Sequence, residues 1–219
     1  LLQTMIFHVM RHELRLIFRE PRFWIPFLIP PVILVASQGI AVGRYGGQIM
    51  EGLEGYMALL LGCLMAPMGA PLAADSFAGE RERNSLELLQ LSPVKPAAVF
   101  WGKLLAVLPF SLVFSLLAIL VYWFSHPMMG GATVVASFLG SASVCFLVTT
   151  FTLLISLNAK SVRSATQSSL FLVVPMLLAV QFFYQEFLGA MLIPVVTLAV
   201  SLAICGIATM VGVKKFVSM

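Results

Sequence analysis

Long apolar runs, separated by short polar segments, dominate the chain from residue 23 onward. Each run has about 20 residues, and at about 1.5 Å per residue this is the length that an α-helix needs to cross the hydrocarbon core of a bilayer. The pattern predicts an all-α integral membrane protein with six transmembrane helices. The predicted spans cover residues 23–42, 56–74, 97–124, 132–157, 164–183 and 191–212.

Residues 1–22 have another pattern and are predicted to form a cytoplasmic amphipathic helix in the membrane interface. Over residues 4–20 the apolar positions recur at steps of three and four, and arginines recur every four residues on another face. Such a helix places its arginines toward lipid phosphates or a protein partner, and the two roles are compatible. The apolar positions are Phe7, Met10, Leu14 and Phe18, and the basic ones are Arg11, Arg15 and Arg19.

Prolines interrupt the cytoplasmic halves of the first two predicted spans within the six-span domain of residues 23–219. Because proline removes a backbone donor and crowds the preceding turn, these spans are predicted to be kinked. The predicted hinge positions are Pro26, Pro30, Pro31, Pro67 and Pro71.

The fourth predicted span is rich in hydroxyl groups, which can bond their own helix or a neighbouring one. This density favours helix packing over a path for a solute. The residues are Ser141, Ser143, Thr149, Thr150, Thr152 and Ser156.

Composition and charge agree with a membrane protein. With 60% hydrophobic residues, 10% charged residues and a mean hydropathy of +1.02, the chain is too apolar for a soluble domain, in which about a quarter of the residues are charged. Twelve of the 13 basic residues fall on one side of the predicted topology, and Arg44 falls on the other. The positive-inside rule then predicts that both termini are cytoplasmic. This topology also accounts for the net charge of +4, so nucleic acid is not a predicted partner.

The potential metal ligands are scattered along the chain. Cys63, Cys145 and Cys205 lie far apart inside apolar runs and are predicted to be small core residues. His8 and His12 lie one turn apart, but no third ligand accompanies them, which favours two polar surface residues over a metal or haem site.

Residues 75–96 form the most charged segment and hold seven of the 22 charged residues. Asn84 is predicted to cap the start of a short cytoplasmic helix, with Glu87 in the position that reaches back to the cap, and Pro93 to end it. Leucines would cover more than one face of this helix, so a partner is expected to cover them. They are Leu86, Leu88, Leu89 and Leu91.

The sequence carries no source of energy of its own. It has no G-x-x-x-x-G-K-[ST] phosphate loop and no recognisable pair of a nucleophile and a base. Asp75, Lys103 and Glu186 lie near the ends of predicted spans, whereas ion-coupled transporters usually need an ionisable group near the midplane. Energy is therefore expected to come from another chain.

Three short runs follow one another in and after the charged segment. They are Ala78-Gly79-Glu80-Arg81-Glu82-Arg83-Asn84-Ser85-Leu86-Glu87-Leu88-Leu89, Leu91-Ser92-Pro93-Val94 and Gly102-Lys103-Leu104. Together they resemble the signature between the second and third spans of type-2 ABC exporter permeases. This family includes small six-span subunits that are haem-exporter B-like or sodium-exporter B-like, and the layout of the spans extends the resemblance to the whole chain.

The resemblance implies the type-2 ABC exporter permease fold and the permease subunit of an ATP-driven exporter in a bacterial cytoplasmic (inner) membrane. The subunit would work as a homodimer, or beside a homologous permease, with two cytoplasmic ABC ATPase subunits. ATP and Mg²⁺ would be bound by the ATPase, and no cofactor is expected in this chain. The family's coupling helix would correspond to residues 84–91, within a cytoplasmic coupling segment at residues 75–96, and the predicted hinges would transmit its movement. The residues implied to contact the ATPase are Glu80, Arg81, Glu82, Arg83, Asn84, Ser85, Leu86, Glu87, Leu88 and Leu89.

Other interpretations stay open. The chain would also fit a membrane scaffold or assembly factor that recruits a cytoplasmic partner without transport, and the run from Glu80 to Arg83 would also fit a solvated loop with self-neutralising charges. An intramembrane enzyme is disfavoured, because no acid, histidine pair or Ser–Lys dyad lies within a span. Apolar walls favour a lipidic, peptidic or amphiphilic cargo, or haem, over a bare ion.

Overall fold

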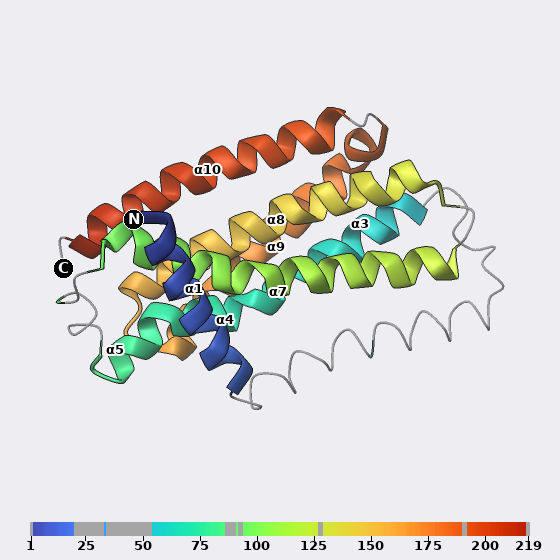
Figure 1. Ribbon diagram of the computed structural model, residues 1–219. Helices are drawn as coiled ribbons and strands as arrows, with labels where there is room; N and C mark the ends of the chain where they lie inside the picture. The colour runs from blue at the N-terminus through green and yellow to red at the C-terminus, as the bar shows by residue number, and fades with distance from the viewer. Residues whose placement is uncertain are drawn as a thin grey trace.

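A computed structural model of the chain shows a bundle of long helices that lie side by side, with one shorter helix across one end (Figure 1). Among the residues described, five helical segments are long and apolar enough to cross a membrane, and no strand occurs. The described residues are 2–19, 33, 54–85, 91, 94–126, 129–189 and 192–217.

The helices follow the predicted order. The first predicted span, residues 23–42 with Pro26, Pro30 and Pro31, lies outside the described residues apart from Ile33. The N-terminal helix and the predicted spans two to six are found close to their expected positions. Their bounds are α1 Leu2–Arg19, α3 Glu54–Leu64, α4 Ala70–Ala74, α5 Glu80–Glu82, α7 Pro96–Ser125, α8 Gly131–Asn158, α9 Val162–Gly189 and α10 Leu192–Val217.

The second span is one continuous but irregular helical segment, Glu54–Glu82, which contains α3, α4 and α5. A 3-10 turn at Ala66–Gly69 separates α3 from α4. Pro67 lies in the first turn of this 3-10 helix, and Pro71 lies in the first turn of α4. A proline is tolerated there because its missing N–H would have no helical partner in a first turn.

A π-helical stretch at Asp75–Gly79 then joins α4 to α5, so the helix does not end at Ala74 as predicted. The charged residues that follow Ala74 continue the helix because they contact neighbouring elements, as described below. The first part of the predicted cytoplasmic segment, residues 75–96, is therefore the end of the second span.

The fifth span also runs further than predicted. The predicted fifth span ends at residue 183 and a turn was expected over residues 184–190, but α9 continues to Gly189. No glycine or proline interrupts residues 176–188, and a helix keeps its backbone hydrogen bonds internal where water is scarce. The predicted turn over residues 184–190 was therefore wrong.

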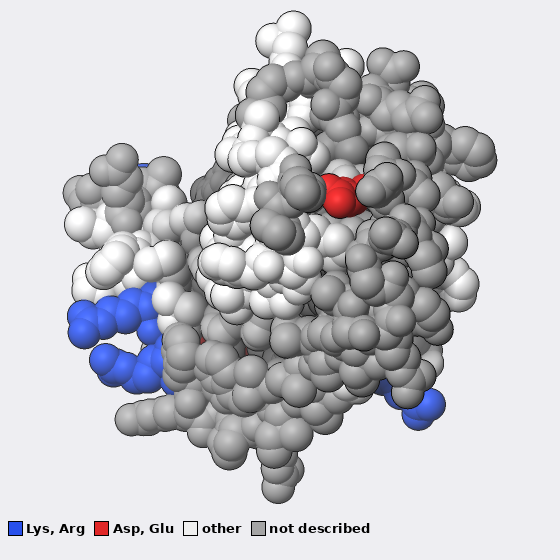
Figure 2. All heavy atoms as spheres, turned by 90° about the vertical axis from the view of Figure 1, so that its right-hand side faces the viewer, with Lys and Arg blue, Asp and Glu red and all other residues white. Residues whose placement is uncertain are grey.

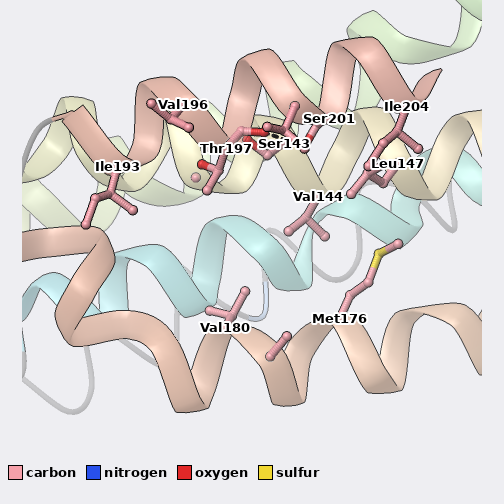
Figure 3. A pocket seen from close by; sticks show the side chains of 13 residues that line it. Ser143, Val144, Leu147, Met176, Val180, Ile193, Val196, Thr197, Ser201 and Ile204 are labelled. Atoms are coloured by element: carbon pink, nitrogen blue, oxygen red, sulfur yellow. Dashed lines mark hydrogen bonds between the residues drawn. The ribbon is translucent and has the colours of Figure 1, made fainter. Parts of the chain in front are cut away.

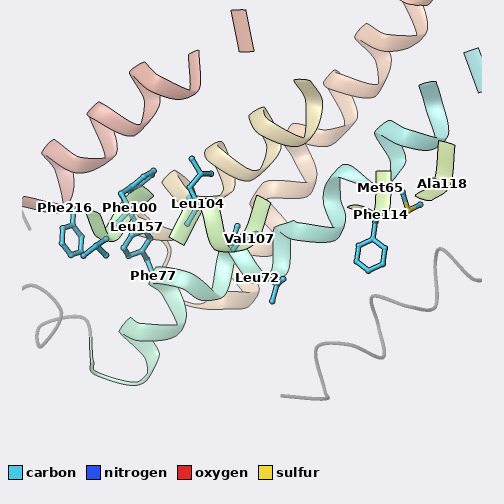
Figure 4. Close-up of a cluster of buried hydrophobic side chains, with 13 residues drawn as sticks. Met65, Leu72, Phe77, Phe100, Leu104, Val107, Phe114, Ala118, Leu157 and Phe216 are labelled. Atoms are coloured by element: carbon cyan, nitrogen blue, oxygen red, sulfur yellow. The ribbon is translucent and has the colours of Figure 1, made fainter. Parts of the chain in front are cut away.

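The core lies where α7 and α8 meet the end of the second span (Figure 4). Phe77 stacks on Phe100 of α7 with ring centroids 5.9 Å apart, and it contacts Phe216 of α10 at 5.7 Å. α8 is central, since it packs against α3, α7, α9 and α10. In a membrane such contacts act through close packing, because lipid tails are as apolar as the side chains themselves.

Four of the six predicted hydroxyl groups of α8 make hydrogen bonds within the bundle, which agrees with the packing interpretation, and that of Thr149 is buried without a hydrogen-bond partner. Ser141 accepts a hydrogen bond from Ser115 of α7, with the two Oγ atoms 2.8 Å apart. Ser143, Thr152 and Ser156 donate to carbonyl oxygens of their own helix. The three cysteines are free and buried, as predicted.

Candidate functional site: a charged junction at one end of the bundle

Charged side chains of the second span meet three other parts of the molecule at the end of the bundle where α1 and α5 lie (Figure 1). We call this region the junction. It consists of residues 75–85 together with the elements that they contact. These elements are α1, the first turns of α7, and the turn between α8 and α9 at residues 159–161.

Lys103 is the centre of the junction. It lies about two turns into α7, and its side chain is only 2% exposed. Its Nζ donates to Oε1 of Glu13 on α1 at 2.7 Å, to Oε1 of Glu80 at 2.8 Å and to the carbonyl oxygen of Ser76 at 2.9 Å. Burying an ammonium group is costly unless it is paired and hydrogen-bonded, and here all three of its protons have acceptors. One side chain thus joins α1, α7 and the second span.

The cluster around Lys103 has no spare donor. Two carboxyl groups share one ammonium group, and Oε2 of Glu80 is buried without a hydrogen-bond partner. On another side the ammonium lies 5.2 Å from the centre of the Phe77 ring, a favourable cation–π distance. Loss of the lysine would leave both carboxyl groups without their counter-charge.

Gly102 lets α1 come close enough for the ion pair. A Cβ atom at this position would lie 2.6 Å from Cγ1 of Val9 and 3.3 Å from the carbonyl oxygen of Ile6, both on α1. Any larger residue would push α1 away from α7 and stretch the contact between Glu13 and Lys103. The adjacent pair Gly102 and Lys103 therefore provides the space and the charge that hold α1.

Arg81 and Glu82 hold the turn between α8 and α9. The guanidinium group of Arg81 donates to the carbonyl oxygen of Leu157 at 2.7 Å and to that of Ala159, at the C-terminal end of α8. Oε1 of Glu82 accepts from the backbone N–H of Val162, the first residue of α9, at 2.9 Å. The last carbonyl groups and the first N–H groups of a helix have no partner within the helix. The helix dipole also favours a cation such as Arg81 at the C-terminus of α8 and an anion such as Glu82 at the N-terminus of α9.

Asn84 ends the helical segment of the second span. Its φ of 56° is in the left-handed region, its N–H donates to the carbonyl oxygen of Arg81, and the N–H of Ser85 donates to that of Glu80. This is the pattern of a Schellman C-cap, in which asparagine replaces the more usual glycine. The prediction that Asn84 caps the start of the next helix is corrected, because an N-cap residue has an extended backbone conformation.

Arg83 points outward and makes a weaker contact. Its Nη2 lies 3.4 Å from Oδ2 of Asp75, and both side chains are accessible to solvent. An exposed ion pair of this geometry contributes about 0–1 kcal/mol to stability. Arg83, Glu82 and Asn84 form the part of the junction that is most open to an incoming partner.

The junction changes the roles predicted for the charged run. Glu80 and Arg81 were expected to contact an ATPase, but their described contacts are made within the chain. The alternative of a solvated loop is wrong for Glu80–Glu82, which are helical and contact other elements, whereas Arg83 lies in an exposed turn. Leu86, Glu87, Leu88 and Leu89 are not among the described residues. Their role in a coupling helix therefore stays a prediction.

The predicted N-terminal helix is present as α1, and its place in the membrane interface stays a prediction. Arg11 and Arg15 are exposed, as are His8 and His12, whereas the side chain of Arg19 is not among those described. Within the described part of the chain, no group of three His, Cys, Asp or Glu side chains could hold a metal ion.

Sequence reasoning missed Glu13, Ser76 and the central role of Lys103. The available signal was the position of Lys103 two turns inside an apolar run, which requires a counter-charge. Asp75, Glu80 and Glu82 lie at that end of the neighbouring span, and Glu13 and Glu20 lie within the N-terminal amphipathic pattern, so the sequence offered several candidate partners for Lys103.

Comparison with known proteins places the chain in a family. A family model described as ABC-2 type transporter matches residues 4–187, a range that begins in α1 and ends within α9. A search of curated individual proteins gave no significant match. The family match covers the junction and most of the helical bundle, and the chain therefore belongs to the ABC-2 type transporter family of membrane proteins.

Proposed function

We propose that this membrane component of an ABC transporter is the permease subunit of an exporter, driven by ATP hydrolysis on separate cytoplasmic ATPase subunits. The observation that carries the proposal is the junction, where one buried lysine ties the end of the second span to α1 and α7. A force applied to residues 83–91 would reach three elements through contacts of 2.7 to 2.9 Å. The ATPase, and not this chain, would bind ATP and Mg²⁺.

The distribution of charge supports a cytoplasmic position for the junction. α1, α5 and the C-terminal end of α10 with Lys214 and Lys215 lie at the same end of the bundle (Figure 1). Figure 2 views the opposite end, and its described surface is mostly uncharged, with Lys and Arg visible only at the margins. By the positive-inside rule the junction end would face the cytoplasm, in a bacterial inner membrane under this proposal.

The exposed side of α9 supports a pair of permease copies. In the most apolar 18-residue stretch of this span only 17% is buried inside the bundle, whereas 67% of the corresponding stretch of the second span is buried. Its exposed residues include the polar Ser164, Gln167 and Ser168, and polar side chains within spans usually face protein or water instead of lipid. A second copy, or a homologous permease, would cover this side.

The experiment is to co-purify the chain with a candidate ATPase and to replace Leu88 and Leu89 by Asp. Complex formation and substrate-stimulated ATP hydrolysis are both expected to be lost, because the charges prevent insertion of an apolar helix into a groove. Phe124→Asp, at the opposite end of α7, is the matched control and should leave both unchanged. Unchanged assembly and hydrolysis in the double variant would remove the coupling role, while assembly without any stimulation would favour a scaffold.

The same ATPase assay can distinguish between the two kinds of permease, haem-exporter-like and sodium-exporter-like. Transport or stimulation by haem, by an amphiphile or by Na⁺ would separate a haem-exporter-like subunit from a sodium-exporter-like one. The apolar interior favours haem or another amphiphile in this proposal.

A further inference from the structure

A groove of about 470 Å³ lies on the side of the bundle between α8, α9 and α10 (Figure 3). This volume is within the range of about 300–1,000 Å³ that is usual for small-molecule sites. The groove is far from the junction along the helices, because its residues lie in the middle of α8 and α9 and in the first half of α10. Its walls include Ser143, Leu147, Met176, Ala179, Val196 and Val200.

The described walls of the groove present hydrocarbon and no free hydrogen-bond donor. Its three hydroxyl groups belong to Ser143, Thr197 and Ser201, and each donates to a carbonyl oxygen of its own helix. Water is stable in a cavity only with two to four polar partners, and a lipid headgroup would need charged or donor groups. The chemistry of the walls therefore fits an apolar chain.

The length of the groove matches one membrane leaflet. On α10 its wall runs from Ile193 to Ile204, which corresponds to about 16 Å at 1.5 Å per residue. The hydrocarbon core of a bilayer is about 30 Å thick, so the groove covers about half of it. It extends from the Leu192 end of α10 to its middle, as an acyl chain in a single leaflet does.

The groove opens to the outside of the bundle. Val196, Val200 and Ile204 are exposed on its α10 side, and α10 packs chiefly against α8 and only slightly against α9. At this depth the surrounding solvent is lipid, and an empty groove would forfeit van der Waals contacts along its walls. A linear hydrocarbon chain can enter from the side and restore those contacts.

We propose that the groove between α8, α9 and α10 is a binding site for one acyl chain of a membrane phospholipid. The site is separate from the junction, and the proposal does not depend on ATPase coupling. A lipid chain there would add to the slight direct contact between α9 and α10.

The test uses the purified chain in nanodiscs that contain phosphatidylglycerol with a photoactivatable diazirine in the middle of one acyl chain. Cross-linked peptides are then mapped by mass spectrometry. Labelling is expected to concentrate on residues of the groove in α8, α9 and α10, and Val200→Trp, which fills the groove, is expected to abolish it. Val211→Trp is the matched control, because Val200 is 51% exposed and Val211 is 56% exposed on the same helix, and only Val200 lines the groove.

A second variant guards against a local folding defect in α10. Ala179→Leu fills the groove from α9 and should also abolish the labelling, while gel filtration shows that both variants keep the behaviour of the parent protein. Labelling that is equally strong around Val211 would show ordinary contact with bulk lipid and overturn the proposal. A disulfide between two copies that carry Val200→Cys would also overturn it, because a second copy would then be the occupant.

Discussion

The junction and the groove are at different depths of the same bundle, and they hold it together in different ways. At the junction, Lys103, Arg81 and Glu82 connect elements through hydrogen bonds to charged groups. At the groove, α9 and α10 barely touch, and the walls are apolar. Apolar side chains gain little by leaving lipid for protein, so a few polar contacts can determine how membrane helices are arranged. The difference suggests a rigid junction and a more adaptable lipid-facing side.

The largest effect is expected from Lys103→Met. The change leaves Glu13 and Glu80 without their counter-charge, and breaking a buried ion pair in this way costs about 3–5 kcal/mol. Thermal unfolding in detergent should show a large decrease in melting temperature. Lys95→Met, at an exposed position just before α7, is the control and should change little.

Adding Glu13→Gln and Glu80→Gln to Lys103→Met tests the physical reason. The triple variant removes the uncompensated charges and should regain part of the lost stability. Equal melting temperatures for Lys103→Met and Lys95→Met would mean that the cluster does not hold the junction.

A smaller loss is expected from Arg81→Ala. Hydrogen bonds from a charged donor contribute about 1.5–3 kcal/mol, and this change exposes two carbonyl groups at the end of α8. Hydrogen exchange should become faster for the amides of residues 157–162. Arg83→Ala is the control and should change hydrogen exchange little, because Arg83 makes a weak, exposed ion pair. An increase in exchange as large as that in Arg81→Ala would contradict this assignment of Arg83.

Gly102→Ala should loosen α1 from α7. The added Cβ would lie 2.6 Å from Cγ1 of Val9, and overpacking of this kind destabilises a protein by about 1–3 kcal/mol. The higher helix propensity of alanine offsets up to about 1 kcal/mol of this loss. Limited proteolysis should cleave α1 more readily in the variant. Val9→Ala in the same chain makes room for the new methyl group and should restore protection, whereas no rescue would place the cause elsewhere.

The smallest effect is expected away from the junction, for Ser115→Ala. Its hydrogen bond to Ser141 joins α7 to α8 inside the membrane, where such bonds contribute about 0.6 kcal/mol on average. The melting temperature should decrease slightly, and much less than for Lys103→Met. A loss similar to that of Lys103→Met would show that the interior hydroxyl groups, and not the junction, determine stability.

Much of the fold could be predicted because it depends on local pattern. The apolar runs located α7, α8 and α10 closely, and the spacing of apolar and basic residues located α1. The end of α9 was predicted wrongly, because the end of an apolar run does not by itself end a helix. Local polarity is a weaker signal than the absence of glycine and proline.

The candidate site could be predicted only in part. The run from Glu80 to Arg83 was predicted to contact a partner chain, and its contacts within the chain were not predicted. Lys103 pairs with Glu13, 90 residues away in sequence, and Arg81 contacts residues 76 and 78 positions away. No periodic pattern carries contacts at such separations.

The amino-acid sequence alone determined that this chain crosses a membrane as helices, because a hydrocarbon environment requires every backbone group to be paired within its own segment. It also located the charged segment and supplied its signature. Only the tertiary structure decided that Glu80 and Arg81 serve the chain itself and that a groove opens between α9 and α10. The reason is that the cost of a buried charge, and the cost of an unfilled space, depend on which distant elements lie beside it.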